Sequence, residues 1–278
     1  MKKISVVMCI YEGDNTEHFK QSLESLLPNR EYFSELILIR NGKINNQKIS
    51  LINDFKKNLK IKFIKLKKNL GLSKALNIGI EKAQFQWIAR FDSDDYCARD
   101  RFKKINEIIN RHGKELDVFG TYIQEFNFDI NKLSFERRVP HDHKAINRRL
   151  LISSPMNHVT VVFKKSLINR FSNPDFYPYI DGFEDYALWA KLLGSNVNFR
   201  NFPISTVYVR TGNSMLKRRG GFSYLIKEIK LRFYIAKYIP IQLIPLNFLI
   251  CIFRLVAFSS PVIIKKYLYK FLRTNITK

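Results

Sequence analysis

The chain has 278 residues, of which 46% are hydrophobic and 14% aromatic, and its formal net charge is +24. This length and apolar content exclude a wholly disordered chain and allow either one large domain or one domain with an appendage. The excess of basic residues predicts a polyanionic partner, either a nucleic acid or an anionic membrane surface.

The first half of the chain alternates between strand and helix patterns. Four short runs are predicted as strands: 4–10, which is apolar and rich in β-branched residues, 35–39, 61–66 and 87–91. Three segments between them carry apolar residues at helical spacing and are predicted as helices: 17–27, 47–57 and 73–83, the last with Ser73 as its N-cap. This order predicts an α/β fold with a mainly parallel central sheet, helices on both faces, and a ligand site beyond the carboxyl ends of the strands.

The pattern becomes less regular after Gly113. Further strands are predicted over 117–120, 121–128 and 158–163, and further helices over 143–151 and 185–193.

The C-terminal part has a different character. Residues 211–278 contain thirteen Lys or Arg and one acidic residue, Glu228. One predicted helix has a single apolar stripe: Phe222, Leu225, Ile226, Ile229, Phe233 and Ala236. The following uncharged run, 238–253, contains two prolines and is shorter than the roughly 20 residues of a membrane-spanning helix. We therefore expect a basic amphipathic helical tail that lies on a membrane without crossing it.

Three carboxylates follow the strand predicted over 87–91. Asp92, Asp94 and Asp95 would repel one another at the end of a buried strand unless a cation compensates them. Oxygen ligands select hard ions such as Mg²⁺ or Mn²⁺, which commonly share their coordination with substrate phosphates. The alternative is a solvated turn before the next helix. The sequence has neither a Gly-x-Gly-x-x-Gly dinucleotide motif after the first strand nor a P-loop.

A second acidic pair, Glu184 and Asp185, lies at the start of a predicted helix. It either stabilises the positive end of the helix or presents a general base to a cleft. One carboxylate cluster for a metal and a diphosphate, with a second that accepts a hydroxyl proton, suits the transfer of a sugar from a nucleotide to an alcohol.

Several segments together resemble family 2 glycosyltransferases of the GT-A fold: 5–8 with Tyr11, 69–80, 90–95, 157–160, 183–186 with Trp189, 207–210 and 217–221. Within that family they resemble the enzymes that build bacterial capsule, exopolysaccharide and O-antigen repeat units, including the amylovoran biosynthesis type. The resemblance covers about residues 4–221 and is weaker in the tail.

This resemblance implies roles for individual residues. The residues implied for nucleotide-sugar binding are Tyr11, Asn41, Gly71, Lys74, Arg90, Asp92, Ser93 and Asp94. Asp92 and Asp94 would also hold Mn²⁺ or Mg²⁺, and Asp185 would be the catalytic base with Glu184 as its partner or rival. The residues implied for acceptor or diphosphate contact are His158, Trp189, Lys217, Arg218 and Arg219.

Some of these assignments have alternatives. His158 is either a ligand contact or a structural histidine, and Trp189 is either a core residue or a platform for a sugar. Asn41-Gly42 stands where the family usually has Asp-Gly, with the Asp contacting uracil, which leaves the nucleotide open. Cys9 and Glu12 also replace the usual Pro and Asn.

The sequence thus predicts a GT-A catalytic domain over 1–221, with a nucleotide-sugar half (1–115) and an acceptor half (116–221), and a membrane-associating tail over 222–278. The predicted activity is inverting transfer of a hexose from a nucleotide-sugar, best a UDP-sugar, to a lipid-linked oligosaccharide in surface polysaccharide biosynthesis. We expect a peripheral or monotopic protein at the cytoplasmic face of the cell membrane that binds no nucleic acid. The alternative is a decayed GT-A scaffold that binds membranes or nucleic acid.

Overall fold

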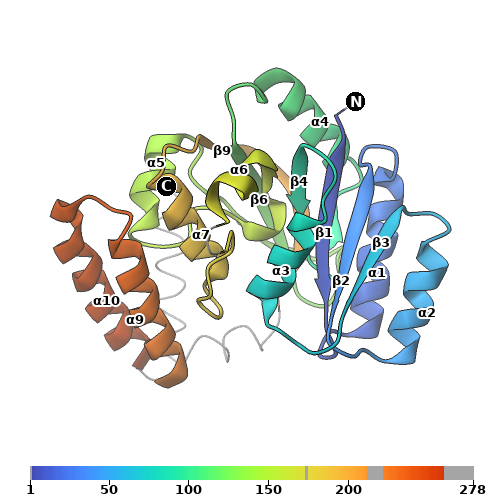
Figure 1. The fold of residues 1–278 in the computed structure, drawn as a ribbon, viewed down its shortest axis with the longest axis horizontal. Helices are drawn as coiled ribbons and strands as arrows, with labels where there is room; N and C mark the ends of the chain where they lie inside the picture. Colours follow the sequence, from blue (N-terminus) through green and yellow to red (C-terminus); the bar gives the residue numbers. More distant parts are fainter. Residues whose placement is uncertain (1, 173–174, 212–221, 260–278) are drawn as a thin grey trace.

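The computed structural model describes residues 2–172, 175–211 and 222–259, and Figure 1 shows its α/β architecture. The strands of these residues are β1 (Ile4–Ile10), β2 (Glu35–Asn41), β3 (Ile61–Leu66), β4 (Trp87–Arg90), β5 (Tyr96–Cys97), β6 (Val118–Phe126), β7 (Leu133–Arg137), β8 (Val162–Lys164) and β9 (Phe199–Arg210). The helices are α1 (Thr16–Leu26), α2 (Asn46–Phe55), α3 (Leu72–Glu81), α4 (Arg101–His112), α5 (His143–Leu150), α6 (Ser166–Phe171), α7 (Glu184–Leu193), α9 (Phe222–Ala236) and α10 (Ile244–Ser259).

All of these strands belong to one sheet in the order β3-β2-β1-β4-β8-β6-β9-β5, with β7 paired to β6. Strands β1 to β4 pair in parallel, as the alternation of strands and helices predicts. Beyond β4 the sheet is mixed, because β8 is antiparallel to both β4 and β6, whereas β9 is parallel to β6. The predicted fold class is confirmed, and its parallel part carries the carboxyl edge on which the candidate site lies.

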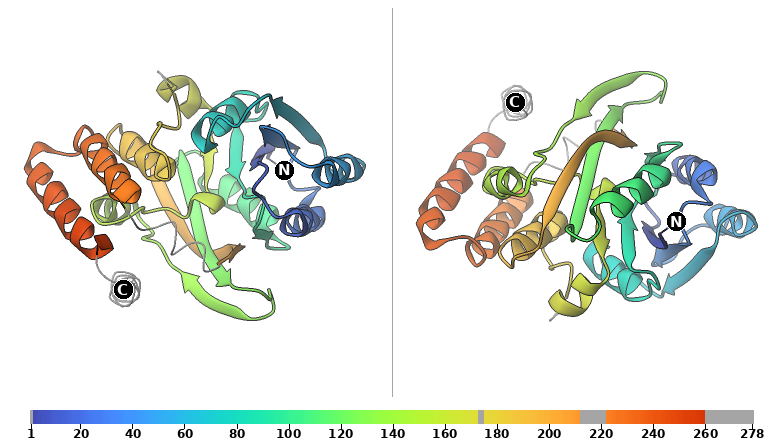
Figure 2. Two further views of the ribbon diagram at one scale, coloured as in Figure 1. Left: turned by 90° about the horizontal axis from the view of Figure 1, so that it is seen from below. Right: turned by 90° about the horizontal axis from the view of Figure 1, so that it is seen from above.

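Each face of the sheet has its own hydrophobic cluster, because successive side chains of a strand point to opposite faces. Val7 of β1 lies in the cluster with α3, α5, α6, α7 and α9, whereas Val6 and Met8 lie in the cluster with α1, α2 and α4. In β2 the same alternation separates Ile37 from Leu36 and Leu38. Figure 2 shows the helices on the two sides of the sheet.

Most of the elements predicted in the first half are present, and several predictions elsewhere were wrong. The N-cap of α3 is Gly71, and the Ser73 hydroxyl instead donates to the carbonyl of Pro178. The strand predicted over 158–163 begins as a 3-10 turn, η2 (His158–Thr160), and only its end forms β8. The two strands predicted over 117–128 are the single strand β6. Strand β9 was missed because charged residues and Pro203 interrupt its apolar pattern.

The last two helices form an antiparallel pair at one end of the molecule, with α9 next to α7 and α10 outside it (Figures 1 and 2). Leu231 and Ile235 of α9 are fully buried in the cluster that contains α7. Among the described residues, no helix combines the length and apolar character needed to cross a membrane. Part of the predicted tail, 260–278, lies outside the described residues.

Candidate functional site

The carboxyl ends of β1, β2 and β4 meet at one edge of the sheet, because these strands are parallel neighbours. Tyr11 follows β1, Asn41 ends β2 and Asp92 comes just after β4. The structure therefore brings together three residues that are distant in the sequence, as the strand pattern predicts.

Asp92 has a dedicated counter-charge. A guanidinium nitrogen of Arg90 forms an ion pair with its carboxylate, and Arg90 is buried whereas Asp92 remains partly exposed. Arg90 also donates to the carbonyl of Phe91. Arg90 therefore restrains the orientation of the Asp92 carboxylate.

A fourth carboxylate, Asp14, joins the group and was missed in the sequence. Its Oδ2 accepts from the Ser93 hydroxyl at 3.0 Å and from the backbone N–H of Tyr11 at 3.0 Å. These bonds tie the segment after β1 to the Asp-x-Asp segment. Asp14 follows Tyr11 by three residues, a spacing that could have identified it as an acid of the same edge.

Asp94 faces solvent at this edge, yet its ionised form is disfavoured. Desolvation by the surrounding protein, together with the charges of Asp92 and Asp14, raises the pKa of Asp94 from 3.8 to about 6. The neighbouring Asp95 is buried, and burial and Asp94 raise its pKa well above 3.8. Burial and mutual repulsion therefore disfavour the simultaneous ionisation of these carboxylates.

Asp95 links this group to β9. Its Oδ1 accepts from the backbone N–H of Arg210 at 2.9 Å, and the Arg210 side chain donates to the carbonyl of Asp94 at 3.3 Å. The Arg210 guanidinium also lies over the rings of Tyr96 and Phe126. Arg210 belongs to a quoted motif but was not predicted as a site residue, because its proximity to Asp94 depends on the pairing of β5 with β9.

Asn41 is buried and uses its whole side chain to hold the segment before α3. Its Oδ1 accepts from the N–H of Leu70 at 2.9 Å, and its Nδ2 donates to Asn69 Oδ1 at 2.9 Å and to the carbonyl of Gly71 at 3.3 Å. Gly71 has a φ of +81° at the N-cap of α3, a backbone conformation that favours glycine. Asn41 therefore holds the backbone before α3 at the carboxyl edge of the sheet.

Tyr179 closes the same side and was missed in the sequence. Its ring is exposed, its hydroxyl donates to the carbonyl of Leu70, and the ammonium of Lys74 lies 5.0 Å from the ring centroid. Lys74 is thereby held beside the 69–71 segment, where a cation can meet a phosphate.

The second acidic pair occupies the first turn of α7. Burial, followed by the charge of Asp185, raises the pKa of Glu184 from 4.5 to about 7. Asp185 Oδ2 accepts from the hydroxyl of Ser154 at 3.4 Å. A helix N-terminus stabilises the ionised form of such carboxylates, and the segment that follows α5 contributes a donor to one of them.

Tyr177 and His158 are buried and contact each other. Burial raises the pKa of Tyr177; the charge of Arg90 opposes this rise, whereas those of Asp185, Glu184 and Asp92 add to it. The Tyr177 hydroxyl is 3.1 Å from His158 Nε2. Burial and the charge of a nearby arginine hold the pKa of His158 well below 6.5. A neutral His158 is suited to structural hydrogen bonding more than to neutralising a diphosphate.

The remaining predicted acceptor residues are placed as follows. Trp189 is fully buried in α7, with its ring 6.1 Å from that of His158, which favours the core role that the sequence also allowed. Lys217, Arg218 and Arg219 lie outside the described residues.

The residues at the carboxyl edge can be tested for their fit to a divalent cation. Within the described ranges, no set of three or more His, Cys, Asp or Glu side chains has the arrangement of a complete metal site. Asp92 and Asp94 nevertheless offer hard oxygen donors, and burial, followed by the charges of Asp92 and Asp14, raises the pKa of Asp94. This donor set fits Mg²⁺ or Mn²⁺, which take one or two carboxylates together with substrate phosphates.

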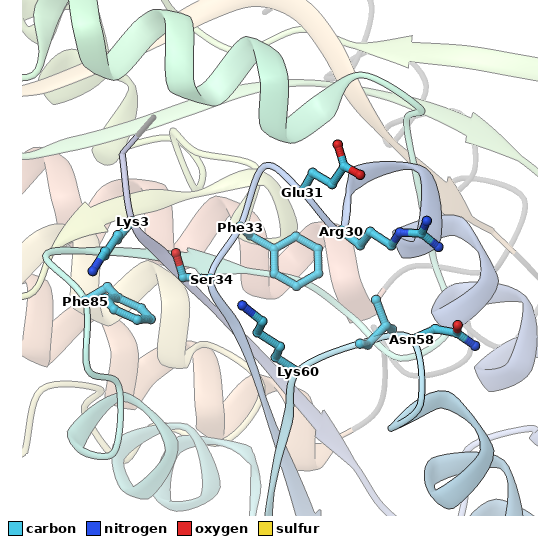
Figure 3. A pocket seen from close by; sticks show the side chains of 9 residues that line it. Lys3, Arg30, Glu31, Phe33, Ser34, Asn58, Lys60 and Phe85 are labelled. Carbon is cyan, nitrogen blue, oxygen red and sulfur yellow. The ribbon is translucent and has the colours of Figure 1, made fainter.

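A cavity of about 510 Å³ lies at the opposite edge of the sheet (Figure 3). Its lining comes from the segments that lead into β1 to β4: Lys3, Arg30, Glu31, Phe33, Ser34, Asn58, Leu59, Lys60 and Phe85. Ligands of sheets of this kind bind at the carboxyl ends of the strands, so this cavity is separate from the candidate site.

The comparisons with known proteins agree with this geometry. The family model "Glycosyl transferase family 2" matches residues 5–171. A UDP-Gal:alpha-D-GlcNAc-diphosphoundecaprenol beta-1,3-galactosyltransferase of Escherichia coli is 34% identical over 96% of this chain and 95% of its own length. The amylovoran biosynthesis glycosyltransferase AmsE of Erwinia amylovora is 30% identical over 82% of this chain and 83% of its own length.

Solved structures show the same fold. TarS of S. aureus, residues 1–349 in complex with UDP-GlcNAc, has a TM-score of 0.63 at 18% identity and covers 85% of this chain and 67% of its own. The length of the family match, the identity to curated relatives and the shared fold lead to one conclusion: this chain belongs to glycosyl transferase family 2.

Proposed function

We propose that this protein is an inverting glycosyltransferase that moves a hexose from a UDP-sugar to a lipid-linked oligosaccharide during surface polysaccharide synthesis. The observation that carries the proposal is that the segment before α7 is hydrogen-bonded to the carboxyl edge of the parallel strands: the Tyr179 hydroxyl donates to the carbonyl of Leu70, and the Ser73 hydroxyl donates to the carbonyl of Pro178 at 3.2 Å. The first carboxylate group lies at that edge and the second at the start of α7. A donor bound at the first group can therefore face a base on the second.

The chemistry assigned to the chain is a single displacement. Asp185 accepts the proton of the acceptor hydroxyl as its oxygen attacks the anomeric carbon, and the bond to the diphosphate breaks on the opposite side, which inverts the configuration. Asp92 and Asp94 would hold Mg²⁺ or Mn²⁺, which neutralises charge that develops on the departing UDP. Arg90 keeps Asp92 oriented, and Asn41 holds the 69–71 segment of the donor side.

The relatives support the substrate classes. A curated relative that aligns with 96% of this chain is named for UDP-galactose and for an acceptor linked to diphosphoundecaprenol. We propose UDP-galactose as the first donor to test and a diphosphate-linked N-acetylglucosamine as the first acceptor. With an acceptor of this kind, we propose the cytoplasmic face of the cell membrane as the place of the reaction.

The test uses the purified full chain, UDP-galactose and a synthetic lipid-diphosphate-GlcNAc acceptor. We expect transfer that depends on Mn²⁺ or Mg²⁺, and a β-linked product by NMR. Asp185→Asn should lower kcat by about a hundredfold or more, the scale for loss of a positioned base, while donor binding persists.

The matched variant is Glu184→Gln, which alters the neighbouring carboxylate of the same helical turn. Normal turnover by Asp185→Asn with an inactive Glu184→Gln would exchange the two roles. A product that retains the donor configuration would contradict the single displacement. Binding of UDP-sugars without any transfer would favour the decayed scaffold.

A further inference from the structure

We propose that the outer faces of α9 and α10 form a lipid-docking surface that holds the catalytic domain on an anionic bilayer. The inference rests on the proposed function in one respect, namely that the acceptor is anchored in a membrane. The surface, called here the outer face, consists of seven apolar residues: Ile226, Ile229, Phe233, Leu246, Leu249, Ile252 and Phe253.

These side chains are exposed to an extent that is unusual for their size. Phe233 is 60% exposed, Leu249 62%, Ile252 60% and Phe253 53%. On each helix the exposed apolar residues recur at spacings of three and four, so they gather on one side. A contiguous exposed apolar patch marks an interaction site.

The side of α9 and α10 opposite the outer face is bonded to the catalytic domain. The outer face therefore stays exposed. Glu228 and Arg232 are fully buried and form an ion pair at 2.9 Å, and Arg254 of α10 donates to the same carboxylate at 3.1 Å. Arg232 also donates to the carbonyl of Leu151 at 2.6 Å, and Arg254 to that of Ile152 at 3.2 Å.

The charges around the outer face select the partner. Lys230 of α9 and Lys237, which directly follows this helix, are exposed, whereas Glu228, the only acidic residue from 211 to 278, is buried. A second copy of this chain would bring cations against cations. An anionic lipid surface accepts both the apolar side chains and the lysines.

The helix pair contacts the segments that hold the candidate base, Asp185. The start of α9 contacts the segment that leads into α7, since the rings of Tyr224 and Phe183 lie 5.3 Å apart and Lys227 forms an ion pair with Asp181 at 2.5 Å. The carbonyls held by Arg232 and Arg254 precede Ser154, which donates to Asp185. A bilayer bound by the outer face would therefore lie beside the part of the enzyme that receives the acceptor.

The test is flotation of the full chain with vesicles of phosphatidylcholine containing about one third phosphatidylglycerol. The double variant Phe233→Glu with Leu249→Glu should float at least tenfold less than the unmodified chain. The matched control is Phe128→Glu, because Phe128 is 95% exposed in the loop between β6 and β7. Figure 2 shows the hairpin of these two strands away from the helix pair. The control should float normally.

Two further measurements keep the result decisive. All variants should keep the same unfolding midpoint and the same transfer rate to a short water-soluble acceptor, and only the double variant should lose transfer to the vesicle-bound acceptor. In a second approach, brominated lipids should quench a tryptophan at Leu249→Trp and not one at Phe128→Trp.

Normal flotation of the folded double variant, or equal quenching at both positions, would overturn the proposal. A dimer in solution that the double variant dissociates would also overturn it, in favour of a second copy as the occupant. Flotation does not require catalysis. The membrane-binding result can therefore be interpreted even if the proposed transferase activity is not found.

Discussion

The buried carboxylate of Glu228 is the most sensitive point of the link between the helix pair and the catalytic domain. Its two oxygens accept from Arg232 at 2.9 Å and from Arg254 at 3.1 Å, and the side chains of Glu228 and Arg232 are both 0% exposed. Glu228→Gln keeps the shape but leaves two guanidinium groups without their counter-charge. Breaking a buried ion pair from one side costs about 3–5 kcal/mol, and we expect a loss of stability of this size.

The assay is urea unfolding of the full chain, followed by fluorescence of its two tryptophans. The matched control is Glu24→Gln, because Glu24 also pairs with a cation four residues away, Lys20, at 3.9 Å, but with side chains that are 45% and 47% exposed. An exposed pair of this kind contributes less than about 0.5 kcal/mol.

The double variant Glu228→Gln with Arg232→Gln should cost less than the sum of the single changes, because it removes one of the charges that the first change leaves uncompensated. A loss below about 1 kcal/mol for Glu228→Gln, with an unchanged dependence on urea, would refute the reasoning, since it would mean that water or another group compensates the two arginines.

Three other predictions concern the candidate site. Asp94→Ala should abolish Mn²⁺-dependent binding of UDP by calorimetry and lower transfer by at least about a hundredfold, and unchanged UDP affinity with Mn²⁺ would contradict the metal assignment. Because the folded state raises the pKa of Glu184 from 4.5 to about 7, it retains a proton that the unfolded chain releases, so stability should fall as the pH rises through this window. Glu184→Gln should remove that fall and gain up to roughly 3 kcal/mol at pH 8 relative to the unmodified chain, and parallel pH profiles of the two proteins would argue against the raised pKa. Asn41→Ala should raise the KM for the donor with a smaller change in kcat, because it releases the 69–71 segment. The control Asn53→Ala, on the exposed side of α2, should change neither value. Equal donor KM values for the two variants would exclude the positioning role of Asn41.

The sequence by itself determined the parallel half of the fold and the edge that carries the acids. The runs 4–10 and 61–66 are short and bounded by polar residues, and they coincide with β1 and β3, respectively. Asp92 could be placed at the carboxyl edge because a buried strand leads directly into it, and parallel pairing brings the ends of such strands together.

The tertiary structure alone decided how the charges are compensated. Periodicity records which side of an element is apolar, but the partner of a charge depends on contacts between distant segments. The pairing of β5 with β9 brings Arg210 to the Asp-x-Asp segment, and the bonds of Asp14 join the ends of β1 and β4.

Helix α9 also shows that the sequence pattern does not predict which side of a helix is buried. From the sequence its polar residues suggest a solvent-facing side, yet Glu228 and Arg232 are buried because each finds a partner, and much of the apolar stripe around Phe233 remains exposed. A buried charge is tolerated only where its counter-charge is present, and that counter-charge comes in part from Arg254 on another helix. The pattern of one helix therefore predicted its amphipathic character, while its packing against α7 and α10 decided which side faces the protein.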